Sequence, residues 1–470
     1  MKRRDFLKTG SLAALGGMLL TPFGAKANTI KEEFRGKKAK NIIFMVSDGM
    51  SVGTMIMADI YLKRKNGKSS NWVGLYEDNL VQRALMDMAS ANAIVTDSAA
   101  ASSSWGGGVR VNNGSLNVSP NGKENMPILQ KFKKAGKKVG CVTTVPITHA
   151  TPAGFCVTSK RRNAMDHIAE QYAELNFDVM MGGGSQYFDK DKRKDKKDVF
   201  DLFVKKGYTI AKTKSEMLSA PKNKPILGTF DEDAVPYTVD HLRDEKASRN
   251  IPSLAEMAQK AIDQMKDHKN GFALQIEGGK VDWAAHGNDI AALLFDQIAF
   301  DEAVKVVMDF AKKDKNTLVV ITSDHGNANP GLIYGSKTND NFDHLQKFTH
   351  SNDWILQGIH ASSSTSFVKD RIAEACGGFA ITDEQAKELL SYYNNLKKED
   401  GLYNHKNLPF RALAEMQKAY TSVGWISMDH SSDYTELAMY GPGSENLKSF
   451  VRNTDMHNFL LNAAHVENKF

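Results

Sequence analysis

The sequence is poor in three features that would each point to a particular class of protein. Only three cysteines occur among 470 residues, Cys141, Cys156 and Cys376, which is too few for a disulfide framework. The formal net charge is only +6, so nothing indicates a nucleic-acid partner. No apolar run reaches the roughly 20 residues that a membrane-spanning helix needs, and there is no internal repeat. What remains has the composition of an ordinary globular protein.

The N-terminus carries a targeting pattern. A basic segment with the twin arginines Arg3 and Arg4 precedes a short apolar stretch, residues 11–23, and an Ala-x-Ala cleavage site ends at Ala27. The twin arginines followed by Phe-Leu-Lys resemble a bacterial twin-arginine export signal, whose machinery carries folded cargo; an ordinary signal peptide is the alternative. Residues 1–27 hold five Lys/Arg and one Asp, so cleavage lowers the net charge to +2.

This pattern predicts where the protein works. We expect residues 1–27 to be a signal peptide and residues 28–470 to be the mature domain, periplasmic or secreted, with no stable membrane anchor after cleavage. Folding before export would take place in a reducing compartment, where disulfides are not expected. The low cysteine content agrees with that route.

Four continuous apolar runs predict strands that are covered on both faces. They are residues 41–46, 138–144, 272–276 and 318–322. Helical patterns separate them, among them a capping box of Ser253 and Glu256 before residues 254–265, and a long amphipathic stretch at residues 290–310. The alternation predicts an α/β fold, a three-layer α/β/α sandwich with a large, mainly parallel central sheet. In such sheets ligands bind at the carboxyl ends of the strands.

Two segments look like additions to this core. Residues 185–248 are rich in Lys and Asp, and we expect the Lys-rich stretch 189–206 to be a solvated face. Residues 335–425 carry helical patterns of their own, at about 364–375, 383–397 and 409–420.

Several polar residues stand where a buried strand ends or a helix begins. Ser98 opens a run of small residues after Thr96-Asp97, where a helix start would bring its hydroxyl close to free backbone N–H groups. A plain helix cap is the simpler interpretation of that triplet. Asp282 and His286 are four residues apart, so on a helix they project from one face, as two zinc ligands can.

Further candidate metal ligands follow the apolar runs. These are Asp48, Glu277, the adjacent pair Asp324 and His325, and His430, which precedes a candidate strand at residues 435–440. Carboxylates and imidazoles without a suitable cysteine favour zinc together with a harder cation such as magnesium.

Five motifs resemble, in order along the chain, the signatures of the alkaline phosphatases. They are Asp48-Gly-Met-Ser, Thr96-Asp-Ser-Ala-Ala, His149-Ala-Thr-Pro-Ala, Glu277-Gly-Gly-Lys-Val-Asp-Trp-Ala-Ala-His286 and Ser323-Asp-His-Gly. The resemblance runs from about residue 40 to the end, apart from the two additions. It implies hydrolysis of phosphate monoesters through a phosphoserine, a homodimer, and an inserted crown-like region at 335–425 that could form a lid, an interface or a surface decoration.

The resemblance also implies roles for single residues. Ser98 would be the nucleophile, and Arg162, oriented by Asp97, would clamp two phosphoryl oxygens. Each chain would bind two Zn²⁺ and one Mg²⁺. One zinc would be held by Asp282, His286 and His430, the second by Asp48, Asp324 and His325, and the magnesium by Asp48, Thr151 and Glu277.

Some of these assignments have competitors. Arg161 is next to Arg162 in a basic run, and His430 competes with four histidines of the insertion: His344, His350, His360 and His405. A phosphodiesterase or a sulfatase on the same fold is the main alternative function. A noncatalytic periplasmic protein that binds metal or phosphate is the alternative from another class.

The sequence also departs from the best-known bacterial pattern at two positions. His149 and Trp283 stand where that form has aspartate and lysine. His149 could hydrogen-bond to water near the magnesium, or could recruit zinc to the third site. Because Trp283 cannot bind phosphate as an ammonium group does, we expect weaker binding of the phosphate product.

Overall fold

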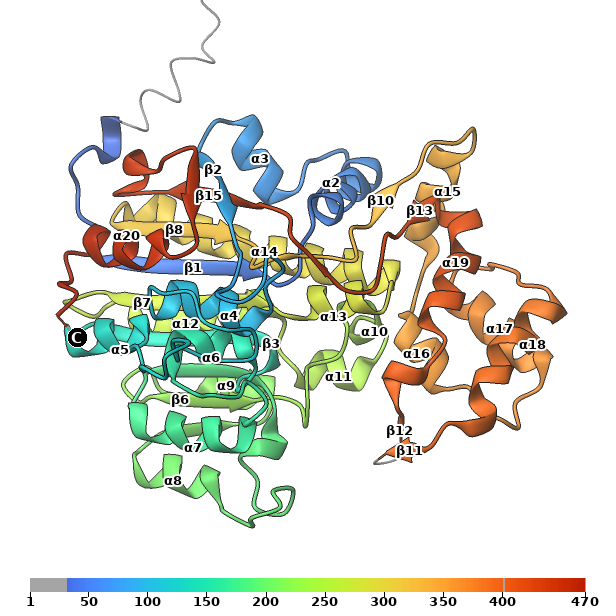
Figure 1. Ribbon diagram of the computed structural model, residues 1–470, viewed down its shortest axis with the longest axis horizontal. Coiled ribbons are helices and arrows are strands. Elements are labelled where there is room, and N and C mark those ends of the chain that lie inside the picture. The colour runs from blue at the N-terminus through green and yellow to red at the C-terminus, as the bar shows by residue number, and fades with distance from the viewer. Residues whose placement is uncertain (1–31, 400–401, 470) are drawn as a thin grey trace, which may run out of the picture.

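The computed structural model describes residues 32–399 and 402–469, so the expected signal peptide lies outside the described residues. A ten-stranded sheet forms the centre of the molecule (Figure 1). In spatial order its strands are β16 (Phe450–Arg452), β2 (Gln82–Asp87), β15 (Thr435–Tyr440), β8 (Thr317–Thr322), β1 (Asn41–Ser47), β7 (Phe272–Gly278), β3 (Lys138–Pro146), β4 (Val179–Gly183), β6 (Ile226–Thr229) and β5 (Thr209–Ala211).

The sheet is mainly parallel, as predicted. Among its described strands only β15 runs antiparallel, to both of its neighbours β2 and β8. The predicted strands at 41–46, 138–144, 272–276, 318–322 and 435–440 correspond to β1, β3, β7, β8 and β15. All seven residues of β1 and of β7 are buried, which is typical of parallel strands covered on both faces.

Alternate side chains of the central strands enter two separate hydrophobic layers. Ile43 and Met45 of β1 belong to one cluster, and Ile42, Phe44 and Val46 belong to the other. The first layer is formed with α2 (Val52–Asn66), α3 (Asn71–Glu77), α9 (Lys214–Ser219), α12 (Leu254–Met265), α13 (Lys280–His286) and α14 (Ile290–Asp314). The second is formed with α4 (Ser98–Gly106), α5 (Ile128–Lys134), α6 (Ala150–Cys156), α7 (Met165–Leu175), α8 (Val199–Lys205) and α20 (Asp455–Ala463).

These helices begin where their sequences predict. Ser253 and Glu256 form the expected capping box at the start of α12. The side chain of Asp289 caps α14 by accepting from the amide of Ala292, and the helix continues to Asp314, four residues beyond the predicted stretch. The three-layer α/β/α architecture therefore agrees with the sequence-based prediction.

The segment 185–248 is only partly an addition. Its strands β5 and β6 extend the central sheet beyond β4, whereas α10 (Thr238–His241), α11 (Glu245–Asn250) and the 3₁₀ segment η1 (Ser185–Tyr187) lie outside it. The expected solvated face at 189–206 has an exception in Arg193. Its guanidinium group is buried and donates to Asp195, Glu170, and the carbonyl oxygens of Asp166 and Tyr187.

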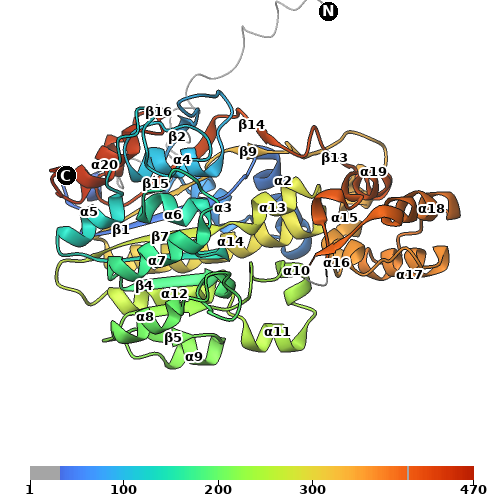
Figure 2. The same cartoon turned by 60° about the horizontal axis from the view of Figure 1, so that its bottom comes forward.

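The segment 335–425 forms a helical body beside one end of the sandwich (Figures 1 and 2). Its helices are α15 (Thr338–His344), α16 (Asn352–Gln357), α17 (Thr365–Ala375), α18 (Asp383–Ser391) and α19 (Phe410–Thr421), with the 3₁₀ segments η2 (Leu345–Lys347), η3 (Tyr392–Asn395) and η4 (His405–Asn407) and the hairpin of β11 (Lys398–Glu399) and β12 (Leu402–Tyr403). The predicted helix at 383–397 is shorter, because η3 replaces its last part.

Short strand pairs and buried carboxylates connect this body to the core. β10 (Gly331–Leu332) pairs with β13 (Val423–Gly424), and β9 (Gly326–Asn327) pairs with β14 (His430–Ser431). At the start of α16, Asp240 accepts from the amide and hydroxyl of Ser351, at 2.9 and 2.5 Å. Asp289 accepts from the amide of Asn352, at 2.5 Å. After β15 the chain continues through η5 (Ser444–Asn446) to β16. No helix in the described part of the chain is long and apolar enough to cross a membrane.

Candidate active site

The candidate residues meet at one edge of the central sheet. In the parallel register of β1 and β7, Val46 lies opposite Glu277, and β8 lies on the other side of β1. Asp48 and the pair Asp324 and His325 follow the ends of β1 and β8, so the topology brings residues from distant parts of the sequence together. All of these side chains are buried, as expected for ligands at the carboxyl ends of parallel strands.

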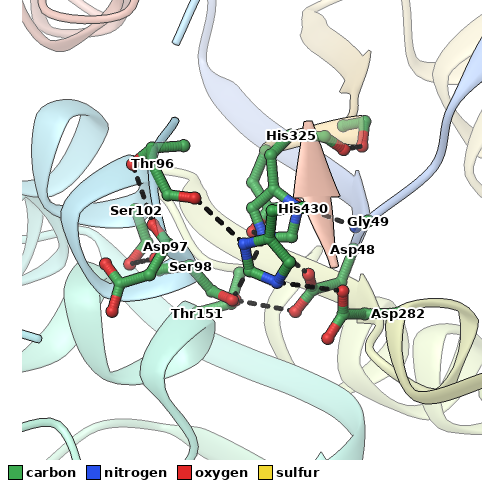
Figure 3. Close-up of polar contacts among 12 residues, drawn as sticks. Asp48, Gly49, Thr96, Asp97, Ser98, Ser102, Thr151, Asp282, His325 and His430 are labelled. Atoms are coloured by element: carbon green, nitrogen blue, oxygen red, sulfur yellow. Dashed lines mark hydrogen bonds and ion pairs between the residues drawn. The ribbon is translucent and has the colours of Figure 1, made fainter. Parts of the chain in front are cut away.

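Ser98 is the first residue of α4, and its hydroxyl faces this group. The side chain of Asp97 caps the helix by accepting from the amide of Ala100 at 2.9 Å. Ser98 Oγ lies 3.3 Å from Nε2 of His325 (Figure 3). The interpretation of the Thr-Asp-Ser triplet as a helix cap is thus correct for Asp97. The hydroxyl of Ser98 takes no part in the cap and is directed at His325.

Asp282, His286 and His430 form the first of three groups that could hold a metal ion. Nδ1 of His286 lies 2.6 Å from the carbonyl oxygen of Met428, and Nδ1 of His430 lies 2.9 Å from that of Thr96. Because a carbonyl can only accept, both Nδ1 atoms carry the proton and both Nε2 atoms carry a lone pair. The two Nε2 atoms are 3.1 Å apart, and each lies about as close to the Asp282 carboxylate, at 3.4 and 3.5 Å. Three acceptors that converge in this way fit a cation.

The second group consists of Asp48, Asp282 and His325. Nε2 of His325 is also close to Asp324, which is not a member of the group. It faces Asp324 Oδ2 at 3.3 Å and Asp48 Oδ1 at 3.5 Å, and neither oxygen has a hydrogen-bond partner among the described residues. Burial, together with the neighbouring carboxylates Asp324, Asp282 and Glu277, raises the pKa of Asp48 well above its usual value. Burial likewise raises the pKa of Asp324 to about 8. Carboxyl groups this crowded need a cation in order to ionise together, so the donor set suits a metal.

The third group consists of Asp48, His149 and Glu277. Thr151 donates to Asp48 Oδ2 at 3.1 Å, and Thr143 donates to Glu277 Oε2 at 2.5 Å. Oε1 of Glu277 has no partner among the described residues, and burial raises the pKa of Glu277 to about 7. Most of these ligand atoms are oxygens, which suits a hard cation, although the histidine adds a nitrogen.

Of the two adjacent arginines, Arg162 is the one brought to this site. Its Nη1 donates to Asp97 Oδ2 at 3.0 Å, and its Nη2 lies 3.3 Å from Nε2 of His149. Arg161 is exposed. The four competing histidines all lie in the insertion and belong to none of the three groups. Trp283 lies beside His149, with the ring centroids 6.0 Å apart and the rings edge to face.

Two residues of the site had not been identified in the sequence. Asn327 donates to Asp282 Oδ1 at 2.7 Å and to the carbonyl oxygen of Asp282 at 3.2 Å. It also pairs with His430 in the short β9–β14 ladder. Thr143 holds Glu277 from within β3. The only signal for Asn327 was its place two residues after His325, and Thr143 looked like any other residue of a buried strand.

Comparison with known proteins agrees with this geometry. The family model described as alkaline phosphatase matches residues 39–466. Alkaline phosphatase 4 of Bacillus subtilis is 31% identical over 442 residues, which cover 90% of this chain and 88% of the relative. The alkaline phosphatase of Escherichia coli is 29% identical over 70% of this chain and 82% of its own length. The crystal structure of Thermus thermophilus alkaline phosphatase superposes with a TM-score of 0.84 at 30% identity, covering 95% of this chain and 96% of that one.

The chain belongs to the alkaline phosphatase family. It is therefore a metal-dependent enzyme that hydrolyses phosphate monoesters, and the resemblance of the five sequence motifs to alkaline phosphatases is confirmed. The covalent phosphoserine mechanism is general to the family. The three metal-binding groups are the natural places for the ions that alkaline phosphatases require.

Proposed function

We propose that this alkaline phosphatase uses Ser98 as its nucleophile and Arg162 as its phosphate clamp. One observation carries the proposal: Ser98 Oγ lies 3.3 Å from Nε2 of His325, within the buried cluster of carboxylates and imidazoles. A helix cap alone has no need of such a neighbour. Asp97 supports both residues, because it caps the helix that begins at Ser98 and accepts from Arg162.

In the first step the oxygen of Ser98 forms a bond to phosphorus while the bond to the leaving alcohol breaks, and the alcohol departs with a proton. In the second step water attacks phosphorus, the bond to Ser98 breaks, and phosphate is released while the serine regains its proton. Arg162 has five N–H groups, of which Asp97 and His149 occupy two. The remaining groups can hold two phosphoryl oxygens side by side, as the planar guanidinium fork allows.

We further propose two Zn²⁺ and one Mg²⁺ per chain. Asp282, His286 and His430 would hold one zinc, and Asp48, Asp324 and His325 the other; Asp48, Thr151 and Glu277 would hold the magnesium. Zinc ions bound there would supply Lewis acidity, which favours the deprotonated forms of the serine and of water and stabilises the attacking and the leaving oxygen of an in-line displacement. The converging lone pairs of His286 and His430 and the unpartnered oxygens of Asp48 and Asp324 support this assignment.

The remaining assignments are proposals as well. Residues 1–27 would be a twin-arginine signal peptide, and residues 28–470 a periplasmic or secreted catalytic domain without a membrane anchor. Segment 185–248 apart from its strands β5 and β6, and segment 335–425, would be insertions, the second a crown-like region. Two chains would form a homodimer. The substrates would be small phosphate monoesters, with no nucleic acid required.

Rapid quenching tests the nucleophile. A ³²P-labelled monoester, mixed with enzyme at mildly acidic pH and stopped with acid, should leave label on the peptide that contains Ser98. Ser98→Ala should lose the label and at least 100-fold of the turnover, while binding zinc as before in elemental analysis. Label on another residue, or full turnover by the alanine variant, would contradict the assignment.

A substrate panel separates the rival enzymes. Nitrophenyl phosphate should be turned over far faster than a bis-nitrophenyl phosphodiester or a nitrophenyl sulfate, and chelation should abolish the activity until zinc is restored. Preference for the diester or the sulfate would identify one of the related activities instead. Complete absence of turnover with all three, in metal-loaded protein, would favour a binding protein.

A further inference from the structure

Two of the three cysteines lie against each other in the interior. Cys141 is in β3 and Cys156 is the last residue of α6, and their sulfur atoms are 3.7 Å apart. Both side chains are fully buried in the second hydrophobic layer. Cys376 is buried as well, but it lies in the helical body 335–425, where its sulfur accepts from the amide group of Gln417. The fold therefore pairs two thiols and leaves the third apart from them.

The elements that carry the two thiols are held firmly in place. Cys141 is in an inner strand of the sheet, because β3 lies between β7 and β4. Helix α6 packs closely against α4, where a side chain at Gly154 would collide with Ser102. The carbonyl oxygen of Cys156 accepts from the side chain of Gln130 at 2.7 Å. The surrounding fold thus determines the contact between the two sulfur atoms.

A covalent bond between these sulfur atoms requires little rearrangement. They would approach from 3.7 Å to about 2.0 Å, a displacement shared by two side chains. The bond would join residues that are 15 positions apart and would fix the end of α6 to the sheet. A disulfide stabilises a protein mainly because it limits the freedom of the unfolded chain, so this bond should stabilise the folded state.

Burial protects the two thiols once the protein has folded. The thiolate is the species that attacks a disulfide, and burial, together with the neighbouring Cys141, raises the pKa of Cys156 well above its usual value. Neither side chain is exposed, so an oxidant in solution does not reach the sulfur atoms of the folded protein. Oxidation of the pair therefore has to take place before folding is complete.

We propose that Cys141 and Cys156 are a disulfide site that is used only when the chain folds under oxidising conditions. One thiolate attacks a sulfur of a disulfide oxidant and displaces the first thiolate of that oxidant. The second protein thiolate then attacks the protein sulfur of the mixed disulfide and displaces the other thiolate. The protein loses two electrons, and the oxidant takes them up with the two thiol protons and becomes two thiols. A chain that folds before export keeps both of its thiols, so the state of the pair records the compartment in which the chain folded.

Refolding in two buffers tests the site. Protein unfolded in denaturant is refolded with zinc and magnesium, either in a mixture of oxidised and reduced glutathione or in a reducing buffer, and its free thiols are then alkylated in denaturant. Mass spectrometry of the peptides should find Cys141 linked to Cys156 after oxidative refolding and both alkylated after reductive refolding. Cys376 should be linked to neither in both samples. Folded protein incubated with the same glutathione mixture should keep Cys141 and Cys156 as thiols. Cell-free synthesis in the two buffers gives the same comparison if the chain does not refold from denaturant.

Thermal unfolding measures whether the fold accepts the bond. The linked protein should unfold about 3 °C above the thiol form, given the length of the closed loop and the size of the domain. Cys156→Ala should abolish this difference between the two refolding conditions, and Cys141→Ala answers the same question if the first variant does not fold. Cys376→Ala is the matched control and should keep the difference.

Three results would overturn the proposal. The first is soluble protein folded under oxidising conditions that contains no link between Cys141 and Cys156. The second is a linked form that unfolds at or below the temperature of the thiol form. The third is a link that forms in the folded protein as readily as during refolding. Turnover of nitrophenyl phosphate is recorded in parallel, so a failure of the proposed catalytic roles is seen separately from a failure of this site.

Discussion

Trp283 shows how a single residue shapes the affinity of the site. It stands beside His149, with the ring centroids 6.0 Å apart. Lys280 is buried, with Nζ 3.5 Å from the ring centre of Tyr237 and 4.9 Å from that of Trp283. The side of the site next to Trp283 therefore has an aromatic ring where an ammonium group would attract phosphate.

Trp283→Lys should accordingly tighten product inhibition. An added ammonium near the phosphate should lower the competitive inhibition constant for inorganic phosphate about three- to tenfold, as expected for one partly exposed charge pair. Trp283→Phe, which keeps a ring and adds no charge, is the matched control and should leave the constant within about twofold of the original value. An unchanged constant in the lysine variant would contradict this account of position 283.

The sequence predicts the site better at some positions than at others. Asp48, Asp324 and His325 could be predicted because each follows a long apolar run, and a parallel sheet places such positions together. Asn327 could not, because its contact with Asp282 spans 45 residues and has no local pattern. The prediction for Arg193 was wrong for a similar reason. A run of charged residues predicts a surface exposed to solvent, and only the fold reveals that four neighbouring groups accept hydrogen bonds from the buried guanidinium of Arg193.

Among the elements, the junction of α10, α14 and α16 concentrates buried acidic groups. Burial raises the pKa of Asp289 to about 8, that of Asp296 to about 7 and that of Asp240 to about 6. Asp296 accepts from the amide and the hydroxyl of Thr238, at the start of α10. Lys280 and Asp240 are the charged groups that act on it. We therefore expect the packing of this junction, including the contacts of Asp240 and Asp289 with the start of α16, to depend on pH.

The sign of this sensitivity follows from the raised pKa. The folded state holds the proton of Asp296 more tightly than the unfolded chain does. The bound proton therefore contributes its full stabilisation to the folded state below about pH 4, where aspartate is protonated in the unfolded chain as well. It is lost as the pH rises through about 7. Asp296→Asn cannot ionise, and the variant should therefore gain stability relative to the unchanged protein, by about 1 kcal/mol or more, between pH 5 and pH 8.

Thermal unfolding across this pH range, at constant metal content, measures the difference. Asp267→Asn, at an exposed position, is the control for the loss of one negative charge. A difference for Asp296→Asn that stays constant or shrinks as the pH rises would show that this carboxyl group does not titrate as its burial indicates.

At the scale of the whole molecule, several large apolar side chains are exposed on neighbouring elements. Val52 and Ile56 of α2 are 41% and 46% exposed, Ile333 and Tyr334 after β10 are 48% and 101% exposed, and Ile426 after β13 is 77% exposed. The pairing of β10 with β13, and the packing of Gly53 against Pro330, keep these segments together. Such a patch on a protein surface is typical of an interaction site, and a second copy of the chain is the partner that the proposed homodimer requires.

Ile56→Arg should then convert the protein to a monomer, because a charge at the centre of an apolar interface between two copies would be buried without a partner. Sedimentation equilibrium reports the mass directly. Val204→Arg on α8, where an apolar side chain is 54% exposed at a distant part of the fold (Figure 1), should leave the mass unchanged. A dimer that survives Ile56→Arg would place the interface elsewhere.

The architecture as a whole was largely predictable, and the exceptions have a physical cause. Strands β1, β3, β7 and β8 lie inside the sheet and read as continuous apolar runs. Strands near its edges do not: β2 alternates exposed and buried residues, and β5 has three residues. Because edge strands bury one face or little at all, their sequences resemble those of surface segments, and β5 was consequently assigned to an addition. β6 was assigned with it, because its buried run has only four residues.

The proposed ligands stretch from Asp48 near one end of the described chain to His430 near the other, and Asp282 lies in a candidate metal-binding group with each of them. During synthesis, which proceeds from the N-terminus, a nascent polypeptide that still lacks its last tenth has no residue 430 to complete the zinc group. Loading of the metals is then a post-translational event, and a premature stop before that point yields a protein that lacks both this ligand and β15, the strand between β2 and β8.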